Sequence, residues 1–206
     1  MLLPLWYEIL FGITFIGFLI SLGICTQLYP PPKYSLLTRT ISGLGHPDHK
    51  SAKIFNPTMI TMGIILAPLP YFLIQVLPAS WLTNIGIGAF FCVPAGLILV
   101  GVFPEHKESR HIIAAVLSLG GSLLANGFLI YPIFVSPLSN FIIGIQIIIL
   151  IVCVPLTISA AKQLPSYTPD QRIEKILYNL NLWEWTQFLT LQTWIFALYL
   201  NLIIAF

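Results

Sequence analysis

The sequence is poor in charge: only 8% of its 206 residues are Asp, Glu, Lys or Arg, while 57% are hydrophobic. Soluble domains carry about 25% charged residues, because a water-exposed surface has to be polar. With a mean hydropathy of +0.92, a soluble fold would expose large apolar patches. This composition excludes an ordinary soluble domain and predicts a chain whose helices use lipid as their solvent.

Other scarcities exclude further classes of protein. The three cysteines, Cys25, Cys92 and Cys153, lie in apolar segments and predict small buried side chains, not a disulfide framework. The net charge of +2 comes without a Lys/Arg run, so no nucleic-acid partner is expected. The first apolar segment lacks a preceding basic region and is expected to be retained as a span.

Six segments have the roughly 20 apolar residues that a membrane span requires. We therefore predict an all-α fold, a single polytopic membrane helix bundle over residues 1–206. The predicted spans are residues 6–28, 57–77, 81–102, 111–135, 138–161 and 183–206. Asn56 and Pro57 are read as the cap and first residue of the second span. Residues 169–180, with apolar side chains at helical spacing, predict a short amphipathic helix in the membrane interface.

All nine basic residues fall between spans one and two, three and four, or five and six, which six-span topology places on one side. Glu8 and Glu184 are assigned to the opposite side. Because cytoplasmic loops are enriched in Lys and Arg, the charged loops are predicted to be cytoplasmic and both termini outside. The predicted location is the cell membrane, with lipids as partners and a membrane or cytoplasmic protein as a possible further partner.

The spans carry no charged residue near their centres. Ion-coupled transporters, proton pumps and voltage sensors place ionisable groups there, so these classes are excluded. Small and polar residues do recur at helical spacing in three spans, and this pattern favours helix packing, with a polar cavity as the alternative. The members of these three faces are Asn84, Gly88, Cys92 and Gly96; His111, Ala115, Ser118, Ser122 and Asn126; and Thr186, Thr190, Thr193, Ala197 and Asn201.

All four histidines lie in two polar segments, residues 40–49 between the first and second spans and residues 103–111 between the third and fourth. Histidine and carboxylate side chains bind zinc or transfer protons near neutral pH. His46, Asp48, His49 and His106 are therefore candidate metal ligands. The simpler interpretation is that these loops are merely the place where polar residues can go, and on balance no cofactor is expected.

Two short patterns in these loops resemble a known family. Ile41-Ser42-x-x-Gly45 is followed by Ile54-Phe55-Asn56, and Gly101-Val102-Phe103-Pro104-Glu105 is followed by His111. Both resemble an uncharacterised six-span family of archaea and bacteria that is grouped with DRAM-type autophagy modulators and GPI-anchor lipid-remodelling factors.

The resemblance implies a membrane protein of lipid organisation or remodelling. It marks Ser42, Gly45, Phe55, Asn56, Pro104 and His111. With Glu105 from the same motif, Ser42, Asn56 and His111 form the candidate catalytic set, acting on a lipid headgroup at one membrane face. The eukaryotic relatives are drawn with cytoplasmic termini, opposite to the orientation that the charges predict.

The alternatives are a non-enzymatic membrane scaffold or assembly protein and, ranked last, a permease for neutral solutes.

Overall fold

The computed structural model describes residues 3–31, 33–163 and 180–205, and every regular element in these ranges is helical. The longest helices are α1 (Leu5–Leu28), α4 (Trp81–Val102), α7 (Asn140–Gln163) and α8 (Leu180–Ile204). The shorter elements are η1 (Ser42–Gly45), α2 (Ala52–Leu66), α3 (Leu69–Ile74), η2 (Glu105–Lys107), α5 (Glu108–Ala115), the π-helical turn η3 (Val116–Gly120) and α6 (Gly121–Phe134). The prediction of an all-α helical bundle is confirmed.

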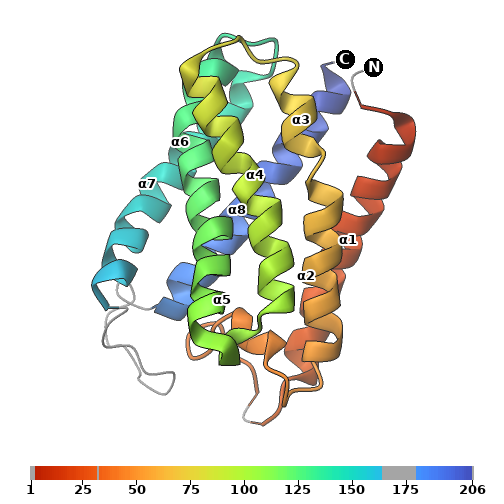
Figure 1. Cartoon of the computed structure of the whole chain (residues 1–206), viewed down its shortest axis with the longest axis vertical. Coiled ribbons are helices and arrows are strands. Elements are labelled where there is room, and N and C mark those ends of the chain that lie inside the picture. Colours follow the sequence, from red (N-terminus) through yellow and green to blue (C-terminus); the bar gives the residue numbers. More distant parts are fainter. Residues whose placement is uncertain (1–2, 32, 164–179, 206) are drawn as a thin grey trace.

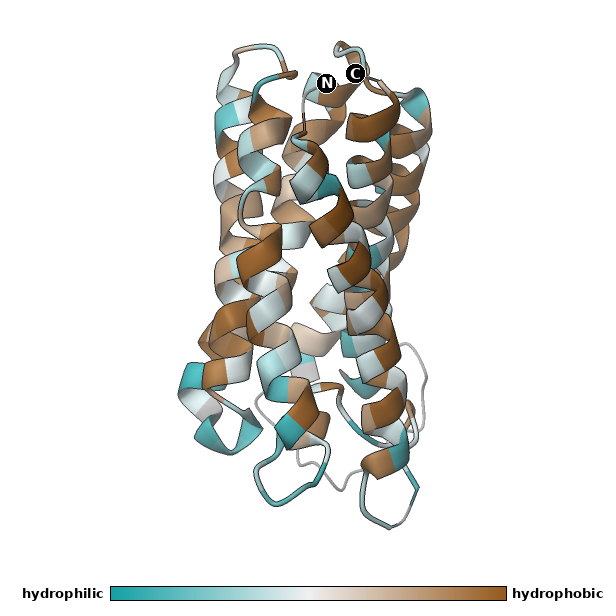
Figure 2. Cartoon of the chain, turned by 90° about the vertical axis from the view of Figure 1, so that its right-hand side faces the viewer, coloured by the Kyte–Doolittle hydropathy of each residue, from teal (hydrophilic) through white to brown (hydrophobic). Residues whose placement is uncertain are grey.

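Six helical segments of the described chain are long and apolar enough to cross a membrane: Leu5–Leu28, Ala52–Ile74, Trp81–Val102, Ser109–Phe134, Asn140–Lys162 and Asn181–Ile204. Figure 2 shows the middle of the bundle dominated by hydrophobic residues and the polar residues gathered toward its ends. The predicted interfacial helix, residues 169–180, lies almost wholly outside the described residues.

The second span begins earlier than predicted. Helix α2 starts at Ala52, so Asn56 lies in its second turn and does not cap it. The reason is packing: Ala52 and Phe55 are buried, and the helix continues back toward the loop to bury them. After the 15 residues of α2, Pro68 interrupts the span, because proline lacks the N–H that an inner turn needs, and the chain resumes as α3.

Both ends of the described chain lie at one end of the bundle, and the described loop residues 29–31, 33–51 and 103–107 lie at the other (Figure 1). Helix α4 packs against α2, α5 and α6, while α7 packs against α6 and α8. Of the six segments α8 is the most buried, with 56% of its most apolar stretch inside the protein, against 28% for α1 and α7. Helix α8 is therefore central to the bundle.

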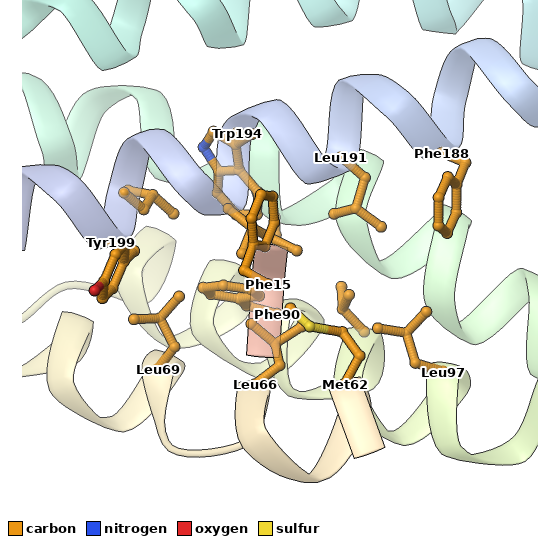
Figure 3. Packing of buried hydrophobic residues seen from close by; sticks show 14 of the residues in the cluster. Phe15, Met62, Leu66, Leu69, Phe90, Leu97, Phe188, Leu191, Trp194 and Tyr199 are labelled. Atoms are coloured by element: carbon orange, nitrogen blue, oxygen red, sulfur yellow. The ribbon is translucent and has the colours of Figure 1, made fainter. Parts of the chain in front are cut away.

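Aromatic residues fill the contact between α8 and the rest of the bundle. Trp194 is fully buried with its ring centroid 4.8 Å from that of Phe90 on α4, and Phe11 of α1 lies 4.5 Å from Tyr199. Figure 3 shows Trp194, Phe90 and Tyr199 with Met62, Leu66 and Leu97 between the helices. These contacts join α8 to α1 and α4.

Candidate functional site

The two polar loops contact each other directly at one end of the bundle. The hydroxyl of Thr40 donates to the carboxylate of Glu105 at 3.1 Å, and the same hydroxyl accepts a hydrogen bond from the amide of Gly43. The rings of His46 and His106 pack with their centroids 6.0 Å apart. The motif-bearing loops therefore form one layer over the ends of the helices.

Ser42 opens the 3₁₀ turn η1 and is buried at the inner face of this layer. Its hydroxyl donates to the carboxylate of Glu184 at 2.9 Å, and its amide lies 3.4 Å from the same oxygen. Glu184 is in the second turn of α8 and is 92% buried. Within the described residues Glu184 makes no ion pair, and its carboxylate is held by hydrogen bonds from the start of η1.

This contact corrects the assignment of Glu184 to the opposite side. The helix that carries Glu184 follows the third charged loop, so its first turns lie at the charged end and not at the end that holds Glu8. A signal was present in the sequence, because an acidic residue at the start of an apolar span needs a partner close by. The partner, Ser42, could not be identified, since the two residues are 142 positions apart.

His111 reaches the same region from α5. Its Nδ1 lies 2.8 Å from the carbonyl oxygen of Phe103, and its side chain is buried. A carbonyl only accepts hydrogen bonds, so Nδ1 carries the hydrogen, and Nε2 of the neutral ring keeps a lone pair. The Phe103 carbonyl thus orients the ring and fixes its tautomer.

A cavity of about 30 Å³ lies below the loop layer, between the ends of α2, α4, α5, η3 and α8. Its polar lining is Ser42, His111, Ser118 and Glu184, and its remaining walls are apolar. The apolar lining residues are Ile41, Phe55, Met59, Leu97, Val100, Ala115, Leu119 and Phe188. A serine, a histidine and a carboxylate around one small cavity can exchange protons.

The other two predicted catalytic residues lie outside this cavity. Asn56 donates from Nδ2 to the carbonyl of Gly45 at 3.1 Å and so fixes the end of η1. Glu105 accepts from Thr40. The structure therefore brings Ser42 and His111 together with Glu184, while Asn56 and Glu105 shape the loops around them.

The three histidines among the four candidate metal ligands lie close together, with the ring centroid of His46 5.1 Å from that of His49 and 6.0 Å from that of His106. Nδ1 of His49 pairs with the carbonyl of Gly43 at 3.0 Å, and His46 lies 3.7 Å from the exposed Asp48. His106 contacts only one of the other histidines through its ring. Within the described ranges no three His, Cys, Asp or Glu side chains are placed to hold a metal ion.

Tyr34 links the loop layer to α8. Its hydroxyl donates to the carbonyl of Thr40 at 2.7 Å and accepts from the indole of Trp185 at 2.8 Å. Burial raises the pKa of Tyr34 above its usual value of 10. The neutral phenol is thus the form that completes this link.

The polar helix faces predicted from the sequence are buried on the fourth span but only in part on α4 and α8. On the fourth span, Ser118, Ser122 and Asn126 are all buried, as the spacing indicated. On α4, however, Gly88 is exposed and Gly96 is buried, so the four residues do not share one packed face. On α8, Thr193 is exposed, and the buried polar side chains are instead Asn181, Glu184, Gln187 and Gln192.

The fold and the apolar exterior define a multi-pass membrane protein with six candidate spans and a buried polar site at its charged end. The chain belongs to the family described as Protein of unknown function (DUF998), whose model matches residues 15–201 and therefore covers every residue of the site. Comparison with the curated proteins and with the solved structures finds no match.

Proposed function

We propose that the loop end of this protein binds a lipid headgroup and remodels it. The observation that carries the proposal is the Ser42 hydroxyl held on the buried carboxyl of Glu184, with His111 lining the same cavity. Buried polar groups in membrane spans are costly and are usually retained for function. Both loops resemble an uncharacterised six-span family that is grouped with lipid-remodelling factors, and this resemblance favours the same substrate class.

The chemistry of the three side chains supports this assignment. Glu184 is placed to accept a proton from the Ser42 hydroxyl, and Nε2 of His111 supplies a second acceptor. Both acceptors face one small cavity whose other lining residues, such as Met59 and Leu97, are mostly apolar.

The surface above His111 adds positive charge. Lys107 and Arg110 lie over the ring of Phe103 at 5.7 and 5.4 Å, and an open depression is lined by His106, Lys107, Ser109 and Arg110. Phe103 thus contacts the two basic groups through its ring and orients His111 through its carbonyl oxygen. Lys and Arg attract anionic headgroups at a membrane surface, so a phospholipid is the preferred substrate class.

The test is a lipid assay with matched variants. The protein is reconstituted in vesicles of phosphatidylglycerol and phosphatidylethanolamine, and lipid products and co-purified lipids are measured by mass spectrometry. Glu184→Gln and Ser42→Ala are expected to abolish product formation. Glu8→Gln and Ser136→Ala, which lie at the other end of the bundle, are expected to leave it unchanged. Equal lipid profiles for wild type and Glu184→Gln would refute the proposal.

A second candidate is a non-enzymatic scaffold. The bonds from Thr40 to Glu105 and from Asn56 to Gly45 give the loops a defined outer shape that a partner protein could recognise. A stoichiometric partner that is lost on Thr40→Val, together with no change in any lipid, would favour this function over the first.

We also propose that the loop end lies in the cytoplasm and the termini outside, because Lys and Arg are in excess in the loops. A cysteine introduced at the exposed Lys107 should resist a membrane-impermeant maleimide in intact cells and react after permeabilisation. Immediate labelling in intact cells would reverse the orientation.

A further inference from the structure

The cavity below the loops contains a polar group without a partner. The hydroxyl oxygen of Ser118 is buried and, within the described ranges, makes no hydrogen bond, although Ser118 lines the cavity. Serines in helices commonly bond a carbonyl in the preceding turn. The neighbouring Ser122 does so, donating to the carbonyl of Leu119 at 2.7 Å. Ser118 differs because its side chain is directed to the cavity.

The local backbone explains why Ser118 takes this position. It lies in the π-helical turn η3, a rare element that widens the helix and is frequent at functional sites. The backbone of Ser118 also packs directly on α4 at Gly96, where no side chain intervenes. These two features hold Ser118 in place and leave its hydroxyl facing the same space as His111 and Glu184.

We infer that this cavity is a binding site for water. A volume of about 30 Å³ accommodates one or two water molecules, since a single water needs roughly 10–15 Å³ measured in this way. A buried water also needs two to four polar partners, and Ser42, His111, Ser118 and Glu184 provide four. An apolar ligand would leave the hydroxyl of Ser118 without a hydrogen bond, which is unfavourable.

The water site does not depend on the proposed function, because it follows from the cavity and its lining alone. The water site also adds a detail to the proposed function. A water held between His111 and Glu184 is a proton carrier between the two groups that the lipid chemistry would use. The site therefore predicts that Ser118 is a positioning residue, acting through the water and not through the substrate.

The experiment is X-ray hydroxyl-radical footprinting of the full-length protein in detergent micelles. Radiolysis of a bound water oxidises the side chains that touch it, and methionine is among the most reactive. Met59 lines the cavity, whereas Met62, about one turn further along α2, does not, and the two are 2% and 0% exposed. Met59 is expected to be oxidised several-fold faster than Met62. Equally slow oxidation of the two would show that the cavity is dry and would overturn the inference.

A variant pair tests the role of Ser118. Ser118→Ala should slow the oxidation of Met59 severalfold, while Ser122→Ala, whose hydroxyl is already bonded to Leu119 outside the cavity, should not. Unchanged Met59 oxidation in a folded Ser118→Ala protein would contradict the assignment of Ser118. If that variant fails to fold, the wild-type comparison of Met59 with Met62 still decides whether water is bound. Neither result depends on lipid turnover, so failure of the lipid assay and failure of the water site are distinguishable.

Discussion

Two glycines of α4 test the packing of the bundle against each other. A β-carbon placed at Gly96 would lie against the amide of Ser118 and 2.7 Å from its Cα, closer than the 3.0 Å below which real contacts essentially never occur. A β-carbon at Gly88 would meet nothing within 4 Å. Both positions lie inside the same helix, so Gly→Ala brings the same gain in helix propensity, up to about 1 kcal/mol.

The difference between the two variants therefore isolates the contact. Overpacking typically costs about 1–3 kcal/mol, and the upper value applies at Gly96 because the obstacle is backbone. Gly96→Ala should lose about 2 kcal/mol of unfolding free energy after the propensity gain, whereas Gly88→Ala should gain up to about 1 kcal/mol. At about 2–4 °C per kcal/mol for a chain of this length, the two melting temperatures should differ by roughly 6–12 °C.

Thermal unfolding in detergent with a thiol-reactive dye measures this difference, because Cys25 and Cys153 are fully buried and react only when the bundle opens. Equal melting temperatures for the two variants would refute the reasoning. That outcome would mean that Gly88 and Gly96 share one packed face, as the sequence pattern suggested, or that neither glycine packs on a neighbour.

Three further variants probe the interior and the loops. Gln192→Met should raise the unfolding free energy by about 1 kcal/mol in the same dye assay, because the buried amide of Gln192 has no hydrogen-bond partner among the described residues; a lower value would show that the amide is satisfied. Gly45→Ala should destabilise the loop layer, since a β-carbon there would collide with the amide oxygen of Asn56. Faster proteolysis between α1 and α2 would register this change, and unaltered proteolysis would contradict it. The pKa of Tyr34 is raised in the folded protein, so its stabilisation is complete below pH 10 and is lost above it, by about 1.4 kcal/mol per pH unit until the folded pKa is reached. Tyr34→Phe should flatten the fall in stability above pH 10, measured by tryptophan fluorescence, and an unchanged alkaline slope would exclude Tyr34 as its source.

Much of the fold was accessible from the sequence, because a bilayer requires long apolar helices and little else. The six spans follow from that requirement, as does the clustering of the charged loops. The buried face of the fourth span was also predictable, since Ser118, Ser122 and Asn126 are among the few polar residues on an otherwise apolar helix. On such a helix a polar stripe identifies the inward face.

Helix α4 shows where this reasoning stops. It is apolar all around, so its own residues do not determine which face turns inward, and its rotation is set by the helices that pack on it. The same holds for Glu184, whose partner Ser42 is fixed by the depth and rotation of α8 against a distant loop. The sequence pattern identified Ser42 and His111, but the presence of Glu184 beside them depends on tertiary packing.

The pairing of Ser42 with Glu184 has a consequence for how the protein is made. Membrane helices are inserted in chain order, and Ser42 lies just after the first span while Glu184 lies in the last. Until that last helix enters, the η1 turn has no carboxyl group to bond and the cavity lacks one wall. The hydrogen bond between these residues is therefore a chemical mark of completed assembly, and a chain that stalls after five spans would present an open, polar end to the machinery that removes unfinished membrane proteins.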